Sequence, residues 1–107
     1  MEHVNHPEHY KANGKECIEV MVEEYGPICT ICFCILNRMK YLWRKGKKDG
    51  NSEDQDSRKA DWYSQYAVHL YSNLPFFKRL LLSIFFSRTF KDICHEIDRM
   101  DQKLTRY

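Results

Sequence analysis

The chain has 107 residues, of which 43% are hydrophobic and 30% charged, and its formal net charge is +2. This length favours a single soluble domain with one modest core. The sequence pI of 8.3 lies below the ~9 that, with a continuous basic stripe, is typical of duplex-DNA-binding domains. The composition therefore predicts a globular domain that binds no duplex nucleic acid.

The N-terminal twenty residues are polar and contain no pattern of a signal peptide. The five cysteines are odd in number, and Cys29, Cys32 and Cys34 lie among apolar residues, which favours reduced, buried thiols over a disulfide framework. Metal binding by this Cys-x-x-Cys-x-Cys run is the alternative, but the second ligand pair of a zinc site is missing. We therefore expect a cytoplasmic protein without a metal site.

Helical periodicity begins after an arm, residues 1–14, that has no regular period. The first predicted helix, Lys15–Tyr25, ends at Gly26-Pro27. A second helix runs from about Cys29 to Lys45 and ends at Gly46. Its predicted buried face consists of Cys32, Ile35, Leu36, Met39, Leu42 and Trp43.

A polar loop, Lys47–Asp56, leads into a third predicted helix from Ser52 to about Ser72. That helix should bury Ala60, Tyr63, Ala67, Leu70 and Tyr71. After a break at Asn73-Leu74-Pro75, an apolar helix spans Phe76–Phe86, too short for a bilayer, which needs ~20 apolar residues. The last helix, Phe90–Leu104, follows a cap at Ser87 or Thr89.

No segment alternates apolar and polar residues as a strand does, so the predicted fold class is all-α. We expect a compact bundle of about four to five helices with an extended N-terminal arm. The single domain, 1–107, divides into the arm at 1–14, a core at 15–72 and C-terminal helices at 73–107.

Four polar or amphipathic side chains share one face of the second predicted helix, because they are spaced i, i+3, i+4 and i+7: Asn37, Lys40, Tyr41 and Arg44. Arginine binds a phosphate through two hydrogen bonds and lysine binds it as a point charge, whereas the amide suits a base edge or a ribose hydroxyl. Lys47 extends this basic stretch. The face therefore suits a phosphate-bearing ligand, and the alternative is a solvated helix face.

On the third predicted helix, Asp56, Lys59 and Tyr63 also share one face. Lys59 would supply a second phosphate contact, and Asp56 would orient a basic residue or bind Mg²⁺ through water. The alternative is a surface ion pair, which contributes only a few tenths of a kcal/mol.

The chain carries "VNHPEHY", "G.ECIE", "N..KYLWR.G.K.G" and "D..KA.WY" in this order between Val4 and about Tyr66. It thereby resembles a family of small phage proteins, long described as a domain of unknown function, that includes the nucleotide kinase of T-odd coliphages. Ser57 and Ser64 depart from that family's pattern, which has leucine at both positions.

The resemblance implies that His6, His9 and Tyr10 join the nucleotide site, and that the chain transfers a phosphoryl group from Mg-ATP to a deoxynucleoside monophosphate in the host cell cytoplasm. It does not identify a catalytic residue. The sequence has no Gly-x-x-x-x-Gly-Lys-Ser/Thr loop, since its four glycines are widely spaced. The alternative is therefore a non-catalytic protein that sequesters a nucleotide-derived signal of host immunity.

The apolar residues of Phe76–Phe86 surround their helix, whereas the surface helix of a monomer keeps a polar face. We therefore expect a homo-oligomer that associates through Pro75–Phe86, with the alternative that this helix packs as a lid on the core. In such an assembly, the arm with His6 and His9 would reach the Lys40–Arg44 face of a neighbour.

Overall fold

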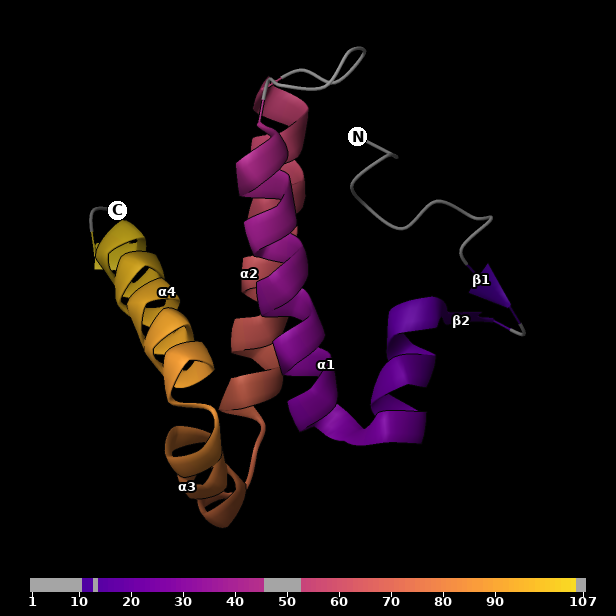
Figure 1. The fold of residues 1–107 in the computed structure, drawn as a ribbon, viewed down its shortest axis with the longest axis vertical. Coiled ribbons are helices and arrows are strands. Elements are labelled where there is room, and N and C mark those ends of the chain that lie inside the picture. Colours follow the sequence, from indigo (N-terminus) through magenta and orange to yellow (C-terminus); the bar gives the residue numbers. More distant parts are fainter. Residues whose placement is uncertain (1–10, 13, 46–52, 106–107) are drawn as a thin grey trace.

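The computed structural model describes residues 11–12, 14–45 and 53–105 (Figure 1). Over these residues the chain forms four helices, namely α1 Cys17–Arg44, α2 Glu53–Ser72, α3 Phe76–Phe85 and α4 Ser87–Thr105. Two short strands, β1 Lys11–Ala12 and β2 Lys15–Glu16, precede them. The predicted all-α class is confirmed, and the predicted boundaries of the helix that begins near Ser52 agree with α2.

The two strands form a small antiparallel hairpin in which Ala12 pairs with Lys15. Gly14 has φ 78° between the strands, a conformation that glycine adopts without steric cost. The expectation that residues 15 and 16 begin a helix and that no strand exists is therefore wrong. Two-residue strands are too short to produce an alternating pattern in the sequence. Lys15 Nζ lies 2.6 Å from Glu23 Oε1, which ties the hairpin to α1 and raises the pKa of Lys15.

A sharp kink divides α1 at Gly26, where φ is 89° and ψ is 163°. Only glycine adopts this backbone conformation readily, and Pro27 next to it cannot donate a helical hydrogen bond. The Thr30 hydroxyl donates to the Gly26 carbonyl at 3.0 Å and so satisfies one of the groups that the kink leaves free. The predicted helix end at Gly26-Pro27 is confirmed, although the chain resumes as a helix at once.

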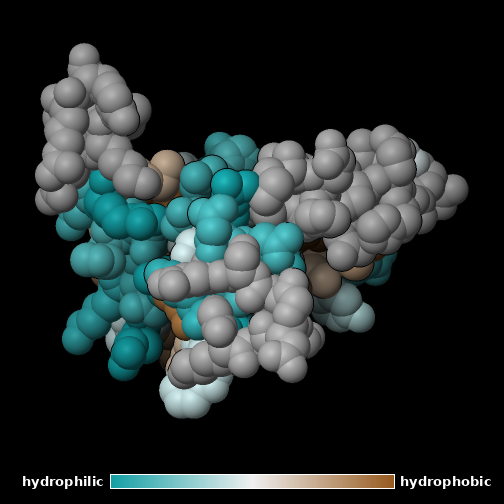
Figure 2. Space-filling model, turned by 90° about the horizontal axis from the view of Figure 1, so that it is seen from above, coloured by the Kyte–Doolittle hydropathy of each residue, from teal (hydrophilic) through white to brown (hydrophobic). Residues whose placement is uncertain are grey.

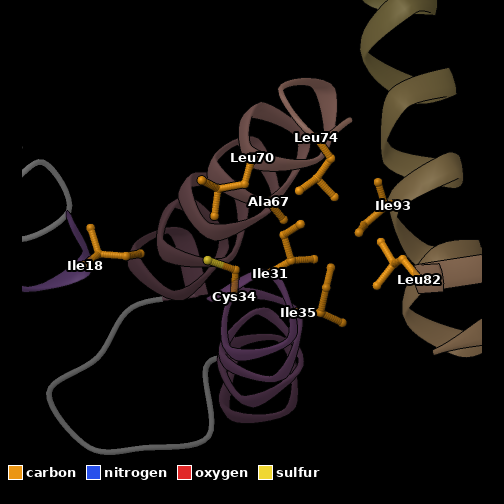
Figure 3. Close-up of a cluster of buried hydrophobic side chains, with 9 residues drawn as sticks. All are labelled: Ile18, Ile31, Cys34, Ile35, Ala67, Leu70, Leu74, Leu82 and Ile93. Carbon is orange, nitrogen blue, oxygen red and sulfur yellow. The ribbon is translucent and has the colours of Figure 1, made fainter. Parts of the chain in front are cut away.

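The longer leg of α1 runs antiparallel to α2 and packs along it, with α4 beside the pair (Figure 1). Ile31, Cys34 and Ile35 of α1 meet Ala67 and Leu70 of α2 in the centre of the core (Figure 3). Leu74, Leu82 and Ile93 extend the core to the turn between α2 and α3, to α3 and to α4. Tyr63 and Tyr71, predicted to be buried in α2, are only half-buried.

The predicted buried face of α1 is largely wrong. Ile35 is buried and Cys32 half-buried, but four other residues of that face are exposed, namely Leu36, Met39, Leu42 and Trp43. The helix is rotated so that Cys34 and Tyr41 face α2 instead. Polar residues are tolerated on the face that packs on α2, because the long side chains of tyrosine and arginine cover apolar surface while their polar ends stay in water.

An ion-pair network, not expected from the sequence, joins three helices. Glu96 of α4 is buried, and its two carboxylate oxygens lie 3.0 Å from Arg38 Nη2 of α1 and 2.8 Å from Arg99 Nη2 of α4. The same Arg99 nitrogen lies 3.4 Å from Asp61 Oδ1 of α2. The network therefore fixes α4 against the α1–α2 pair.

α3 follows Pro75 directly, and only Leu82 of this helix is buried. α4 begins at Ser87, three residues earlier than predicted, and buries Ile93 with Ile97 packed beside it. Within the described ranges, no helix has the length and hydropathy required to cross a membrane.

Candidate functional site

The polar face of α1 lies partly against α2, because Asn37, Tyr41 and Arg44 are half-buried whereas Lys40 is exposed. The ring of Tyr41 stacks on that of Tyr63, with the centroids 5.9 Å apart and the planes inclined by 12°. Phe33 and Trp62 meet Tyr63 edge-on, at 6.0 and 5.0 Å. Such aromatic contacts each contribute about 0.5–1.5 kcal/mol beyond burial, so Tyr41 has a fixed position between the two helices.

Three cationic side chains converge on the Tyr41 ring. Lys40 Nζ lies 4.7 Å, Lys59 Nζ 5.3 Å and Arg44 Cζ 5.3 Å from its centroid. We call Lys40, Tyr41, Arg44 and Lys59 the Tyr41 cluster. The sequence placed Lys40 and Arg44 on one helix face and Lys59 on another, and the packing of α1 on α2 brings them together.

Three positive charges around one ring repel one another, and the ring face offsets this repulsion only in part. A phosphate group would offset much of this repulsion, because it is negatively charged and its oxygens accept charge-assisted hydrogen bonds from lysine and arginine. The Tyr41 cluster therefore has a charge and a set of donor groups that suit an anion.

Asp56 lies on the buried stripe of α2 that also contains Ala60 and Ala67, and its side chain is fully buried. Among the described residues, neither of its carboxylate oxygens has a hydrogen-bond partner. The alternative that Asp56 makes a surface ion pair is therefore wrong. Because a buried carboxylate without a partner is costly, the start of α2 contains an acceptor that a donor group would stabilise.

Arg44 at the end of α1 has a donor in the same condition, because its buried Nε has no hydrogen-bond acceptor among the described residues. Since α1 and α2 are antiparallel, the end of α1 and the start of α2 share one end of the bundle (Figure 1). The described surface at this end is mainly hydrophilic (Figure 2). This end of the bundle thus contains one buried donor and one buried carboxylate without partners among the described residues.

The structure leaves part of the predicted site undescribed. Asn37 is half-buried in α1, on the predicted face with Tyr41 and Arg44. His6, His9, Tyr10 and Lys47 lie outside the described residues, so their part in the site stays a prediction.

All five cysteines are free thiols, but only Cys34 is fully buried, while Cys32 is half-buried and Cys29 exposed. Burial raises the pKa of Cys34 to about 12. Burial also raises the pKa of Cys32, and a hydrogen bond with Thr89 opposes this effect. In the described part of the chain, no three His, Cys, Asp or Glu side chains are grouped as metal ligands.

A family described as a protein of unknown function, DUF3310, matches residues 4–65. This range contains the whole Tyr41 cluster and Asp56, whereas α3 and α4 lie beyond it. No curated protein and no solved structure matches the chain. Because the family match covers more than half of the sequence, the chain belongs to the DUF3310 family of proteins of unknown function.

Proposed function

We propose that this protein binds a nucleotide, with the phosphate groups at the Tyr41 cluster. The convergence of Lys40, Arg44 and Lys59 within 5.3 Å of one aromatic ring carries this proposal. The cations come from two helices that Tyr41 and Tyr63 hold together, so they are arranged before a ligand arrives. Such preorganisation lowers the entropic cost of binding.

A nucleotide suits this end of the bundle better than inorganic phosphate does. Its phosphate groups accept hydrogen bonds from the cations, while its sugar hydroxyls and base N–H groups donate. Lys40 is exposed at this end of the bundle, and Asn37 is half-buried on the same face of α1. A ligand that carries both phosphate groups and hydrogen-bonding sugar or base groups can contact the cations and the Asn37 amide together, which inorganic phosphate cannot do.

Titration calorimetry with nucleoside mono-, di- and triphosphates tests binding. Replacing one charged hydrogen-bonding group costs about 1.5–3 kcal/mol, so Arg44→Ala or Lys59→Met should raise Kd by roughly 10-fold to 150-fold. Arg58→Ala is a matched control, because Arg58 is next to Lys59 but pairs with Asp54 at 2.7 Å in an exposed position. No binding heat with any nucleotide, or equal losses in the Arg58 and Arg44 variants, would refute the proposal.

The first candidate activity is phosphoryl transfer to a deoxynucleoside monophosphate, in keeping with the resemblance to the coliphage nucleotide kinase. An oxygen of the monophosphate would attack the γ-phosphorus of Mg-ATP, the bond to the β-phosphate oxygen would break, and ADP and the diphosphate would leave. The assay measures ADP and diphosphate formation with a panel of deoxynucleoside monophosphates.

The second candidate is binding without turnover, in which the protein sequesters a nucleotide-derived signal of host immunity. Among the described arginines outside the Tyr41 cluster, those at 38, 58, 88 and 99 are ion-paired with carboxylates, and the Arg79 guanidinium lies 5.9 Å from the ring of Tyr71. None of them therefore adds an unpaired cation to the Tyr41 cluster. A transfer reaction must hold two nucleotides in line, which requires more groups than binding one. Tight binding of a cyclic or ADP-ribose-like nucleotide that is recovered unchanged supports this candidate, and ADP formation excludes it.

A further inference from the structure

The outward half of α3 is entirely apolar. At about 3.6 residues per turn, six residues occupy one side of this helix, namely Phe76, Phe77, Leu80, Leu81, Ile84 and Phe85. All six are exposed, whereas Leu82 on the opposite side enters the core. We call these six residues, with Phe86 at the end of the helix, the α3 face.

The size of the α3 face matches one side of a protein interface. Phe76, Phe77, Phe85 and Phe86 are 77%, 59%, 71% and 44% exposed. At about 200 Å² for a whole phenylalanine, these four side chains expose on the order of 500 Å². Leu80, Leu81 and Ile84 are 50%, 43% and 61% exposed and bring the face close to the ~800 Å² that each partner buries in a standard interface. The largest apolar patch of a typical monomer is ~300–600 Å².

The order of residues in α3 suits contact with a second copy of the same helix. Phe76-Phe77 and Phe85-Phe86 mark its two ends, and Leu80-Leu81-Leu82 lies in the middle. In an antiparallel two-fold pair, residues at equal distances before and after Leu81 face each other. Phe77 of one copy then meets Phe85 of the other, the two Leu81 side chains meet at the axis, and the helix dipoles oppose each other.

The charges near α3 favour a protein partner over a lipid surface. Helices that lie on anionic membranes carry several basic residues on their polar side. α3 has only Lys78 and Arg79, and the Arg79 guanidinium lies 5.9 Å from the ring of Tyr71, where it is used within the fold. By contrast, two copies of the α3 face can pack together without bringing like charges into contact, because this face contains no charged residue.

We propose that two copies of this chain associate through the α3 face, as an antiparallel pair of α3 helices with Leu81 at the two-fold axis. This contact goes beyond nucleotide binding, because it involves residues outside the Tyr41 cluster and outside the match to the family.

Light scattering over a range of micromolar concentrations tests the association. The wild-type protein should have a mass of at least twice 13.0 kDa. Leu81→Asp should raise the dimer Kd by roughly a hundredfold or more, because a buried charge replaces a central apolar contact. Tyr25→Asp is the matched control, since Tyr25 is exposed on α1 and lies outside the α3 face, and it should leave the mass unchanged. Circular dichroism verifies that both variants are folded.

Disulfide cross-linking tests the geometry without adding a charge. In a background with Cys17→Ser and Cys29→Ser, Leu81→Cys should form a cross-linked dimer under mild oxidation, because residues at a two-fold axis bring their Cβ atoms together. Phe77→Cys alone should cross-link poorly, and a mixture of Phe77→Cys and Phe85→Cys protein should cross-link well.

Several outcomes would overturn the proposal. A wild-type mass near 13.0 kDa at every concentration excludes the dimer. A folded Leu81→Asp protein that stays associated shows that another surface mediates contact, and efficient cross-linking of Phe77→Cys alone shows a parallel pair. Sedimentation of a monomeric wild-type protein with anionic phospholipid vesicles would assign the α3 face to a lipid surface instead.

Discussion

Glu96 should be the residue whose charge matters most for stability. Glu96→Gln keeps the size of the side chain but removes the charge, and its amide can offer only one acceptor oxygen. In the native protein both carboxylate oxygens are ion-paired, one at 3.0 Å from Arg38 Nη2 and the other at 2.8 Å from Arg99 Nη2, although the second makes no hydrogen bond of regular geometry among the described residues. The substitution therefore places an NH₂ donor next to a guanidinium donor.

The expected loss follows from the burial of the three partners. Removing one partner of a buried ion pair costs about 3–5 kcal/mol, because the remaining charge is uncompensated. The side chains of Arg38 and Arg99 are 23% and 38% exposed, so water solvates part of their charge after the substitution. We therefore expect Glu96→Gln to lower the free energy of unfolding by about 2–3 kcal/mol.

Urea denaturation followed by circular dichroism measures this loss. Asp54→Asn is the control, because it removes the same charge from the exposed Asp54–Arg58 pair and should cost less than about 0.5 kcal/mol. Adding Arg38→Met to Glu96→Gln should recover part of the loss, since it removes one uncompensated charge. A Glu96→Gln protein within about 0.5 kcal/mol of the wild type would refute the reasoning.

Three further predictions concern the kink and the cysteines. Gly26→Ala should lower the free energy of unfolding by about 1–3 kcal/mol, because alanine is strained at φ 89° and ψ 163°. The strain comes from the backbone alone, since no atom lies near the added Cβ. A loss below ~0.5 kcal/mol in urea denaturation would contradict this reasoning. The raised pKa of Cys34, about 12 against 9.0, should make the protein less stable as the pH rises above 9, because only the unfolded chain then releases this proton. The free energy of unfolding should fall by about 1.4 kcal/mol per pH unit, and this fall should diminish in the Cys34→Ala protein. In native protein at pH 8, iodoacetamide should modify the exposed Cys17 and Cys29 but spare Cys34, and rapid modification of Cys34 would argue against its burial.

Local signals in the sequence predicted the helices well. Gly26-Pro27 marks the kink, and Asn73-Leu74-Pro75 separates α2 from α3. Each of these positions depends on the backbone of a few neighbouring residues, which the sequence specifies directly. The hairpin at residues 11–16 was missed because its pairing involves only two residues in each strand.

The rotation of α1 could not be predicted from its own periodicity. Leu36, Met39 and Trp43 form an apolar stripe, and so do Ile31 and Ile35 with Cys34, so the helix has two candidate core faces. The choice depends on α2, whose Tyr63 offers a stacking partner to Tyr41. Packing between helices thus decided which stripe is buried, and Trp43 is exposed.

The candidate site was predictable as two helix faces but not as one cluster. Helical spacing grouped Lys40 with Arg44 and separately Asp56 with Lys59. That these faces meet depends on the antiparallel packing of α1 and α2, which periodicity does not determine. The burial of Asp56 was also unexpected, because an aspartate near the start of a helix is usually solvated.

The two proposals can be tested independently, because the Tyr41 cluster and the α3 face lie toward opposite ends of the α1–α2 pair (Figure 1). If each protomer holds a complete site, folded Leu81→Asp protein should bind nucleotide with a Kd within about threefold of the wild type, since mutations at distant sites act additively. If the N-terminal arm of one copy completes the site of its neighbour, the same variant should bind at least tenfold more weakly, and the loss should diminish as protein concentration restores the dimer. Calorimetry at two protein concentrations distinguishes these results. A weakening that does not depend on concentration, in a folded monomer, would show that the α3 face and the Tyr41 cluster are coupled within one chain and would refute their independence.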